Sequence, residues 1–219
     1  MKLHLGCGDR YLDGYVNIDL FTEGYTDYCY ANKDGVVENL ATMEKYYPTC
    51  FTRSDMNAAA ASHKSGAPIR KCIVDVSGDI RYLSSLDVVG NYQKIPITEI
   101  VMVQVLEHFS IADGEQVLNE CYKVLAPGGK IHLDLPDFGA GVIELLTKSI
   151  DGLSVEDEEF LFRHFFGSQK NEHAYHLNGF TRRRAVRLLV AAGFTNIQDV
   201  TDDYDRPRCY PYFIMEAYK

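Results

Sequence analysis

The first twenty residues constrain the fold more than any other part of the chain. The apolar stretch LHL at 3–5 runs directly into Gly6-Cys7-Gly8, and a second stretch, VNIDL at 16–20, carries Asp19 near its end. Glycine lets a backbone turn sharply and lets a ligand approach it closely. A carboxylate at the end of the next strand can accept hydrogen bonds from both hydroxyls of a ribose. The opening therefore predicts two parallel strands with a nucleoside-binding crevice at their carboxyl ends.

Short apolar strands alternate with helical patterns along the rest of the chain, which is typical of a parallel α/β sheet. The expected strands are 2–5, 16–20, 71–76, 99–104, 130–135, 195–200 and 212–218. The clearest helix is 114–125, whose apolar residues share one face, and it should end at Ala-Pro-Gly-Gly, 126–129. A further helix is expected at 182–192, with Thr181 as its N-cap and Gly193 just past its end.

Two long segments, 21–70 and 138–180, interrupt this alternation. Structureless loops of that size are uncommon in compact domains, so each should contain helices and cover part of the molecule. A length of 219 residues fits one large domain. We therefore expect a single domain over 1–219, with lid-like insertions at about 21–70 and 138–180.

Charge and cysteine content exclude several classes of protein. A net charge of −9 repels phosphate backbones, so a nucleic acid is a weak candidate partner. The basic cluster at 182–187 reads as a solvated helix face, with phosphate recognition as the alternative. The six cysteines form no C-x-x-C pair, which argues against a zinc site or a secreted disulfide framework. No signal peptide or membrane span is visible, so we expect a cytoplasmic protein without a metal or a membrane partner.

The glycine turn discriminates between two kinds of nucleotide ligand. A dinucleotide site would read G-x-G-x-x-G, whereas Tyr11 occupies the third glycine position and Asp19 follows Gly8 by only eleven residues. That spacing leaves room for a turn and a helical stub, not for the helix whose N-terminus would hold a diphosphate. A nucleoside without phosphates, such as S-adenosylmethionine, fits the spacing better.

Three later stretches add polar side chains at strand ends. VDVSGDIRYL at 74–83 contains Asp79-Ile80, where the carboxylate could accept from an adenine amine while the Ile80 backbone faces a ring nitrogen. MVQVLEHF at 102–109 carries Gln104, Glu107 and His108, and CYKVLAPGGKIHLDLPD at 121–137 ends on Asp137. If the parallel sheet is correct, these side chains gather at the same edge as the glycine turn.

Together these motifs resemble class I S-adenosylmethionine-dependent methyltransferases, most closely the short methyltransferases associated with glycan and polysaccharide genes. A late Gly167-Ser168-Gln169 and His176-Leu177-Asn178-Gly179-Phe180 match the G-x-Q and H-x-x-G-F patterns of that group. The resemblance implies a Rossmann-like fold, with a seven-stranded mostly parallel sheet in the order 3-2-1-4-5-7-6, strand 7 antiparallel, and helices on both faces. It implies S-adenosylmethionine as cofactor, bound by Gly6, Cys7, Gly8, Asp19, Asp79, Ile80 and Gln104. Where such families often place an acidic residue before the first glycine, this chain has His4.

The candidate catalytic residues are His108, His176 and Asp137. A histidine is the natural proton acceptor near neutral pH, although a structural role is at least as common for any single histidine. Asp137 should face the same crevice, and its alternative role is to cap the next segment. A base would suit transfer to oxygen on a small-molecule or sugar acceptor, whereas an amine acceptor needs alignment alone. A homodimer is left open.

Two other functions stay open from the sequence. The chain could be an S-adenosylmethionine-binding protein that has lost transferase activity. It could also be an NAD-dependent sugar-modifying enzyme, although it lacks a Tyr-x-x-x-Lys pair and the third glycine of a dinucleotide turn.

Overall fold

The computed structural model describes residues 1–8, 10–20, 38–40, 43–47, 74–91, 95–169, 172–205 and 210–219. Most of the insertion expected at 21–70 lies outside these residues. What is described of it is a short strand, β4 (Glu38–Leu40), and one helical turn, α1 (Met43–Tyr46). The expectation that this insertion covers the crevice therefore stays a prediction.

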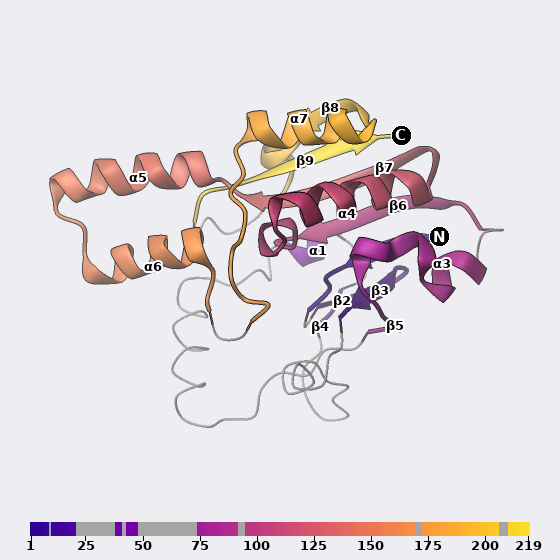
Figure 1. Ribbon diagram of the computed structural model, residues 1–219. Helices are drawn as coiled ribbons and strands as arrows, with labels where there is room; N and C mark the ends of the chain where they lie inside the picture. The colour runs from indigo at the N-terminus through magenta and orange to yellow at the C-terminus, as the bar shows by residue number, and fades with distance from the viewer. Residues whose placement is uncertain are drawn as a thin grey trace, which may run out of the picture.

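A seven-stranded sheet forms the centre of the molecule, in the order β5-β3-β1-β6-β7-β9-β8 (Figure 1). The strands are β1 (Lys2–Leu5), β3 (Val16–Asp19), β5 (Val76–Ser77), β6 (Ile97–Val103), β7 (Leu125–Pro136), β8 (Thr195–Asp199) and β9 (Tyr212–Tyr218). The first five run parallel to one another, and β9 is antiparallel to both β7 and β8. The predicted Rossmann-like sheet, its strand order and its antiparallel seventh strand are confirmed. A small second sheet, which the sequence did not predict, pairs β2 (Arg10–Leu12) with β4.

The alternation of side chains along β6 divides the core between the two faces of the sheet. Ile100 and Met102 belong to the larger apolar cluster, which also contains residues of α4 (Ile111–Val124), α7 (Arg182–Ala192) and η1 (Ile80–Ser85). Val101 points to the other face, where it packs with Tyr46 and Tyr47 in a smaller cluster. Helical segments therefore cover both faces, and the carboxyl ends of the parallel strands remain as the edge where a site can form.

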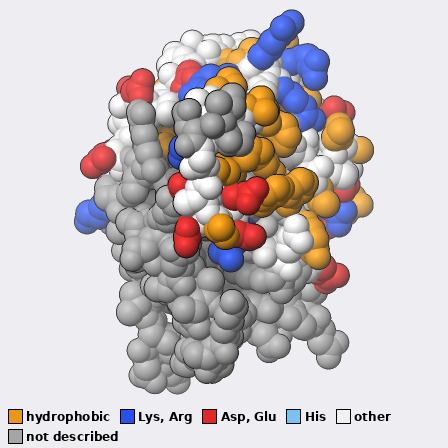
Figure 2. Space-filling view, turned by 90° about the vertical axis from the view of Figure 1, so that its left-hand side faces the viewer, with side chains coloured by type: hydrophobic (Ala, Val, Ile, Leu, Met, Phe, Trp, Pro, Cys, Tyr) orange, Lys and Arg blue, Asp and Glu red, His pale blue; other side chains and the backbone are white. Residues whose placement is uncertain are grey.

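The segment 138–180 contains two helices, α5 (Phe138–Asp151) and α6 (Val155–Phe166), which form a hairpin that extends away from the sheet (Figure 1). Several of its large apolar side chains are exposed, and hydrophobic atoms gather on this side of the molecule (Figure 2). The most exposed of them are Ile143, Leu146 and Val155. Among the described residues, no helix has the length and apolar character needed to cross a bilayer.

Helix boundaries follow their capping residues. The helix α7 has the predicted bounds, because the Thr181 side chain accepts from the Arg184 amide and Gly193 takes a left-handed φ of 103° after its last turn. The helix α4 begins at Ile111, three residues before the predicted start, directly after its N-cap Ser110. Its first residue, Ile111, is exposed and so does not contribute to the apolar face that the sequence pattern detects.

Five of the seven predicted strands differ from the observed ones at their ends, and in three of them an end moves by more than one residue. The strand expected at 71–76 appears as β5 (Val76–Ser77), with 71–73 outside the described residues. The strand expected at 99–104 ends at Val103, because Gln104 has a left-handed φ of 56°. The expected reversal at 126–129 is instead the start of β7: the Gly128 amide donates to the Lys219 carbonyl, and the Lys219 amide donates to Gly129. Pairing with the end of β9 draws this segment into the sheet.

Candidate active site

The glycine turn after β1 is held by two left-handed glycines, Gly6 with a φ of 64° and Gly8 with a φ of 56°. The Gly6 amide donates to the Ile18 carbonyl at 2.8 Å, which ties the turn to β3. A Cβ on Gly6 would lie 2.6 Å from the Val105 Cγ2, whereas a Cβ on Gly8 would meet no atom of the described residues within 4 Å. Gly6 is therefore required by close packing against the end of β6, while Gly8 borders open space. Cys7, between them, is buried.

Asp19 is anchored at the end of β3 by both of its carboxylate oxygens. Its Oδ2 accepts from the Gly8 amide at 2.7 Å, and its Oδ1 accepts from the Leu20 amide at 2.7 Å. Burial raises the pKa of Asp19, and the two amide hydrogen bonds and the charge of His173 oppose that rise. Since each carboxylate oxygen has further lone pairs, Asp19 can still accept from a ligand. The effect of His173 also indicates that the segment before His176 lies near this side of the crevice.

Asp79 and Ile80, predicted to contact adenine, lie at the start of η1. The Asp79 carboxylate accepts from Arg81 at three nitrogens, with the shortest ion-pair distance 2.6 Å, and these hydrogen bonds hold the pKa of Asp79 below its usual range. Ile80 is buried in the larger apolar cluster. An adenine amine would have to share the Asp79 carboxylate with Arg81, so this contact stays a prediction. The nearby Asp75 accepts from the Asn17 amide and the Tyr11 hydroxyl.

Gln104 links three segments at the carboxyl ends of β6 and β7. Its Nε2 donates to the Asp134 Oδ1 at 2.5 Å, and its Oε1 accepts from the Tyr210 hydroxyl at 3.0 Å. Its backbone amide also donates to the Asp134 carbonyl. The predicted cofactor-side residue therefore has both ends of its amide in use, in a fixed orientation.

His108 and His176 lie together although they are far apart in the sequence. Their ring centroids are 4.9 Å apart with the planes at 77°. The Nδ1 of His108 bonds to the Tyr175 carbonyl at 3.0 Å, and the Nδ1 of His176 bonds to the His164 carbonyl at 3.0 Å. Since a carbonyl only accepts, both Nδ1 atoms carry the proton, and each Nε2 has the lone pair. Burial, with a further contribution from His108, lowers the pKa of His176 to about 4.

Glu107, next to His108 on η2 (Leu106–His108), is 1 % exposed and belongs to the same cluster. One of its carboxylate oxygens and one nitrogen from each of His108 and His176 all lie within 4.8 Å of one another. Its backbone carbonyl accepts from the Leu177 amide at 2.7 Å and the Asn178 amide at 3.1 Å, which fixes the segment carrying His176 against the end of β6. Glu107 lies within the MVQVLEHF stretch, where the sequence alone gives it no role because a glutamate is ordinarily exposed. Its position between the apolar Leu106 and a candidate histidine was the available signal.

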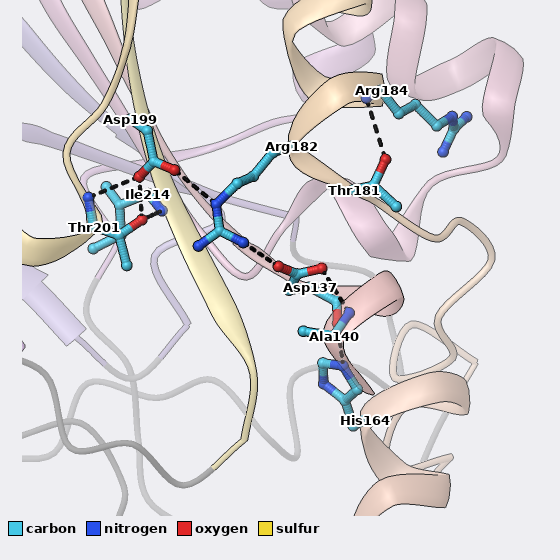
Figure 3. A network of polar contacts seen from close by, with 9 residues as sticks. All are labelled: Asp137, Ala140, His164, Thr181, Arg182, Arg184, Asp199, Thr201 and Ile214. Carbon is cyan, nitrogen blue, oxygen red and sulfur yellow. Dashed lines mark hydrogen bonds and ion pairs between the residues drawn. The ribbon is translucent and has the colours of Figure 1, made fainter. Parts of the chain in front are cut away.

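Asp137 has the capping role that the sequence analysis gave as its alternative. Its carboxylate accepts from the Ala140 amide at 3.0 Å as N-cap of α5 and pairs with Arg182, which also pairs with Asp199 at 2.7 Å (Figure 3). The Asp137 carbonyl bonds to the His164 Nε2 at 3.1 Å. Because the His164 carbonyl in turn accepts from His176, Asp137 reaches the histidine pair through its own carbonyl and through His164. Direct contact of its carboxylate with an acceptor stays a prediction.

The late G-x-Q and H-x-x-G-F motifs are explained by close backbone packing. Gly167 forms a bridge with Tyr175, and a Cβ at Gly167 would lie 2.2 Å from the Ala174 carbonyl oxygen. The Gln169 amide donates to the same carbonyl at 3.1 Å. A Cβ on Gly179 would lie 3.0 Å from the Phe138 ring. These contacts shape the segment that delivers His176.

Comparison with known proteins adds a family match to this geometry. Residues 38–133 match a family model described as a methyltransferase domain. The matched residues make up less than half of the chain. The match covers β6, η2 and α4, and therefore includes Asp79, Gln104 and His108. Among curated proteins, none matches this chain.

Solved methyltransferase structures resemble the chain at low identity. They include an S-adenosylmethionine-dependent methyltransferase named SibL (12 % identity, 100 % of this chain and 50 % of that chain, TM-score 0.48). Others are the magnesium protoporphyrin IX methyltransferase of Synechocystis with bound SAH (13 %, 100 % and 74 %, 0.43) and an O-methyltransferase family protein of Burkholderia thailandensis (10 %, 76 % and 40 %, 0.40). The chain spans only 40–61 % of the length of four of the solved structures that it matches. Similarity at this level assigns no activity.

Proposed function

We propose that this chain is an S-adenosylmethionine-dependent methyltransferase that acts on a hydroxyl group of a small molecule or sugar. One observation carries the proposal. The glycine turn that positions Asp19 packs through Gly6 onto Val105, and Val105 directly precedes the η2 segment that holds His108 against His176. A site for a nucleoside and a candidate proton acceptor thus share the carboxyl edge of β1 and β6.

The residues at the turn fit S-adenosylmethionine. Gly8 borders open space on a left-handed backbone, and the anchored Asp19 carboxylate retains lone pairs for two ribose hydroxyls. Gly6, Cys7 and Gly8 would line the turn, and Gln104 and Ile80 would border the crevice, with Asp79 reaching adenine only by sharing its carboxylate with Arg81. When bound, S-adenosylmethionine supplies a methyl group activated by its sulfonium.

The acceptor side is assigned to the histidine pair. Both Nε2 atoms carry lone pairs, so either can accept the proton that an acceptor hydroxyl releases. Asp137 is proposed as a positioning residue, because its carbonyl bonds to the His164 imidazole and the His164 carbonyl bonds to His176. The net charge of −9 makes a sugar or small molecule a better acceptor than a nucleic acid. A glycan-related substrate is supported by the sequence resemblance.

Other parts of the proposal rest on fewer observations. The thiols of Cys7 and Cys121 are free, which suits a reducing cytoplasm. The exposed apolar side chains of α5 and α6 are available for a lid or for a homodimer contact. The short turn, with Tyr11 in place of a third glycine, remains the argument against an NAD-dependent enzyme.

A cofactor-binding and transfer experiment tests the proposed function. Calorimetry should show binding of S-adenosylmethionine, and Asp19→Ala should weaken it by one to several tenfold steps, since hydrogen bonds to a charged group are worth about 1.5–3 kcal/mol each. A labelled-methyl screen over sugars and small hydroxy compounds should then find an acceptor. His108→Ala or His176→Ala should lower turnover by about 10²–10⁴-fold while cofactor affinity is kept.

Asp13→Ala is the matched control for Asp19. Asp13 is an exposed aspartate between β2 and β3, so its substitution should leave the affinity for S-adenosylmethionine unchanged. Tight binding of NAD without binding of S-adenosylmethionine would overturn the proposal. Cofactor binding with no transfer to any acceptor class would favour the binding protein without transferase activity.

A further inference from the structure

We infer that Glu107, His108 and His176 form a binding site for one divalent first-row transition cation, with zinc as the best fit. One ligand atom from each of the three side chains lies within 4.8 Å of the other two. Two imidazoles and one carboxylate are a donor set that catalytic zinc sites use, with a fourth position open to water or substrate. The imidazole content disfavours magnesium and calcium, which prefer oxygen ligands.

The histidines are oriented as metal ligands usually are. In metalloproteins the nitrogen of a ligating histidine that does not bind the metal commonly donates to a carbonyl or carboxylate, which fixes the tautomer and the ring. Here the Nδ1 of His108 donates to the Tyr175 carbonyl and the Nδ1 of His176 donates to the His164 carbonyl. The lone pair of each neutral ring is therefore on Nε2, the nitrogen that would bind the cation.

The backbone around the cluster is rigid enough to preorganise it. The Glu107 carbonyl accepts from the amides of Leu177 and Asn178, the two residues that directly follow His176. The His176 amide donates to the Phe166 carbonyl at 3.1 Å. In a tetrahedral zinc site the ligand atoms are about 3.4 Å apart, so ligand atoms that lie within 4.8 Å of one another need to close by at most about 1.4 Å.

The three side chains lie where the proposed function places the acceptor. The role of the cation toward the acceptor, described next, therefore rests on the proposed function. A cation held by three protein ligands would offer its open position to an acceptor oxygen. It would lower the pKa of that hydroxyl, as zinc does for bound water. The histidines would then serve as ligands, and the hydroxyl proton would leave to water. Cation binding itself requires neither cofactor nor acceptor, so it can be tested alone.

The test is titration of the full chain, freed of any affinity tag and of metal, with zinc chloride in a calorimeter. A parallel titration with cobalt chloride is followed by visible absorption. We expect one cation per chain and a cobalt spectrum of nitrogen and oxygen ligands without a thiolate charge-transfer band. Glu107→Gln, which keeps the shape of a buried side chain, and His176→Ala should each weaken zinc binding by at least about tenfold. His173→Ala, a nearby partly exposed histidine outside the cluster, is the matched control and should keep the affinity.

Absence of stoichiometric binding would overturn the inference, as would equal affinity in the parent and the Glu107→Gln variant or a cobalt–thiolate spectrum. If His176→Ala proves unfolded by circular dichroism, the Glu107→Gln comparison decides alone. Methyl transfer that persists in zinc-free protein would leave the proposed function intact and remove the metal. Zinc binding in a chain that does not bind S-adenosylmethionine would support the metal site and overturn the proposed function.

Discussion

His4 lies within β1 with its imidazole fully buried. Its Nδ1 donates to the Asn17 Oδ1 at 2.9 Å, and the Tyr46 ring meets it edge-on at a centroid distance of 5.5 Å. Burial lowers the pKa of His4 to about 4, against the opposing effect of the Asn17 hydrogen bond. The ring is therefore neutral in the folded chain at neutral pH.

This burial predicts a specific acid sensitivity. Between pH 6.5 and about 4 the unfolded chain binds a proton at His4 that the folded chain does not, so acidification should lower the free energy of unfolding. The total over that window is roughly 3 kcal/mol for a single histidine. His4→Leu removes the titrating group, while the Asn17 Oδ1 keeps its hydrogen bond from the Leu12 amide. Urea unfolding at pH 7 and pH 5 should therefore show a smaller loss in the variant. An equal loss in both proteins would mean that His4 is protonated in the folded state.

At the scale of elements, the segment from Gly167 to Phe180 is the piece on which the acceptor side depends. It joins α6 to α7 and is held by backbone contacts to η2 and to Asp137. Gly167 has a φ of 76°, and an added Cβ would lie 2.2 Å from the Ala174 carbonyl oxygen. Gly128 has almost the same φ, 77°, but an added Cβ there would meet nothing within 4 Å.

These two glycines differ both in backbone conformation and in the space open to a Cβ. Gly128→Ala should lose about 1–2 kcal/mol because of its positive φ, which corresponds to a drop in Tm of a few degrees. Gly167 combines its positive φ with a ψ of 179°, a conformation that is essentially restricted to glycine, so its backbone cost should be higher. Gly167→Ala should lower the free energy of unfolding further, because its Cβ would overlap the Ala174 carbonyl oxygen and force the two segments apart. It should also weaken zinc binding and turnover, since the segment carries His176. Thermal melts with the assays described above measure both effects. Equal behaviour of the two variants would show that the segment tolerates displacement.

The elements themselves were largely predictable where local signals agreed. The helix α7 has an N-cap threonine, an apolar face and a terminal glycine, and its bounds match the prediction. The start of α4 could not be found from periodicity, because its first turn is exposed and is fixed by Ser110. The early start of β7 could not be found either, since it depends on pairing with Lys219 more than 90 residues away. Local propensity does not contain such contacts.

The candidate site divides in the same way. The glycine turn and Asp19 could be proposed from neighbouring residues, because consecutive elements form them. The full use of the Asp79 carboxylate by Arg81 and the burial of Glu107 depend on side-chain packing that the sequence pattern does not encode. The resemblance to known motifs was enough to place His108 and His176 in the same crevice. Their hydrogen bonds to the Tyr175 and His164 carbonyls could be identified only from the folded structure.

On the scale of the whole molecule, the hairpin of α5 and α6 extends from the sheet and keeps apolar side chains exposed (Figures 1 and 2). We propose that the segment 138–180 orders over the crevice when ligands bind, because exclusion of water and alignment of the acceptor require a cover. Hydrogen exchange should then slow across this segment when S-adenosylhomocysteine and an acceptor are added together. Exchange in the buried core of α4 is the internal control and should not change. If exchange in 138–180 is the same with and without ligands, the hairpin is a packing or oligomer surface.

The position of β9 in the sheet has a consequence for biosynthesis. Among the described strands, β8 pairs only with β9, and β9 inserts between β8 and β7 although it follows both in the chain. A ribosome delivers β8 before its partner exists, so its backbone donors and acceptors have no strand to pair with until 212–218 has been translated. Closure of this edge of the sheet therefore waits until β9 has been translated. Premature termination anywhere before 212 would release a chain with an open β7 edge, which is a template for aggregation.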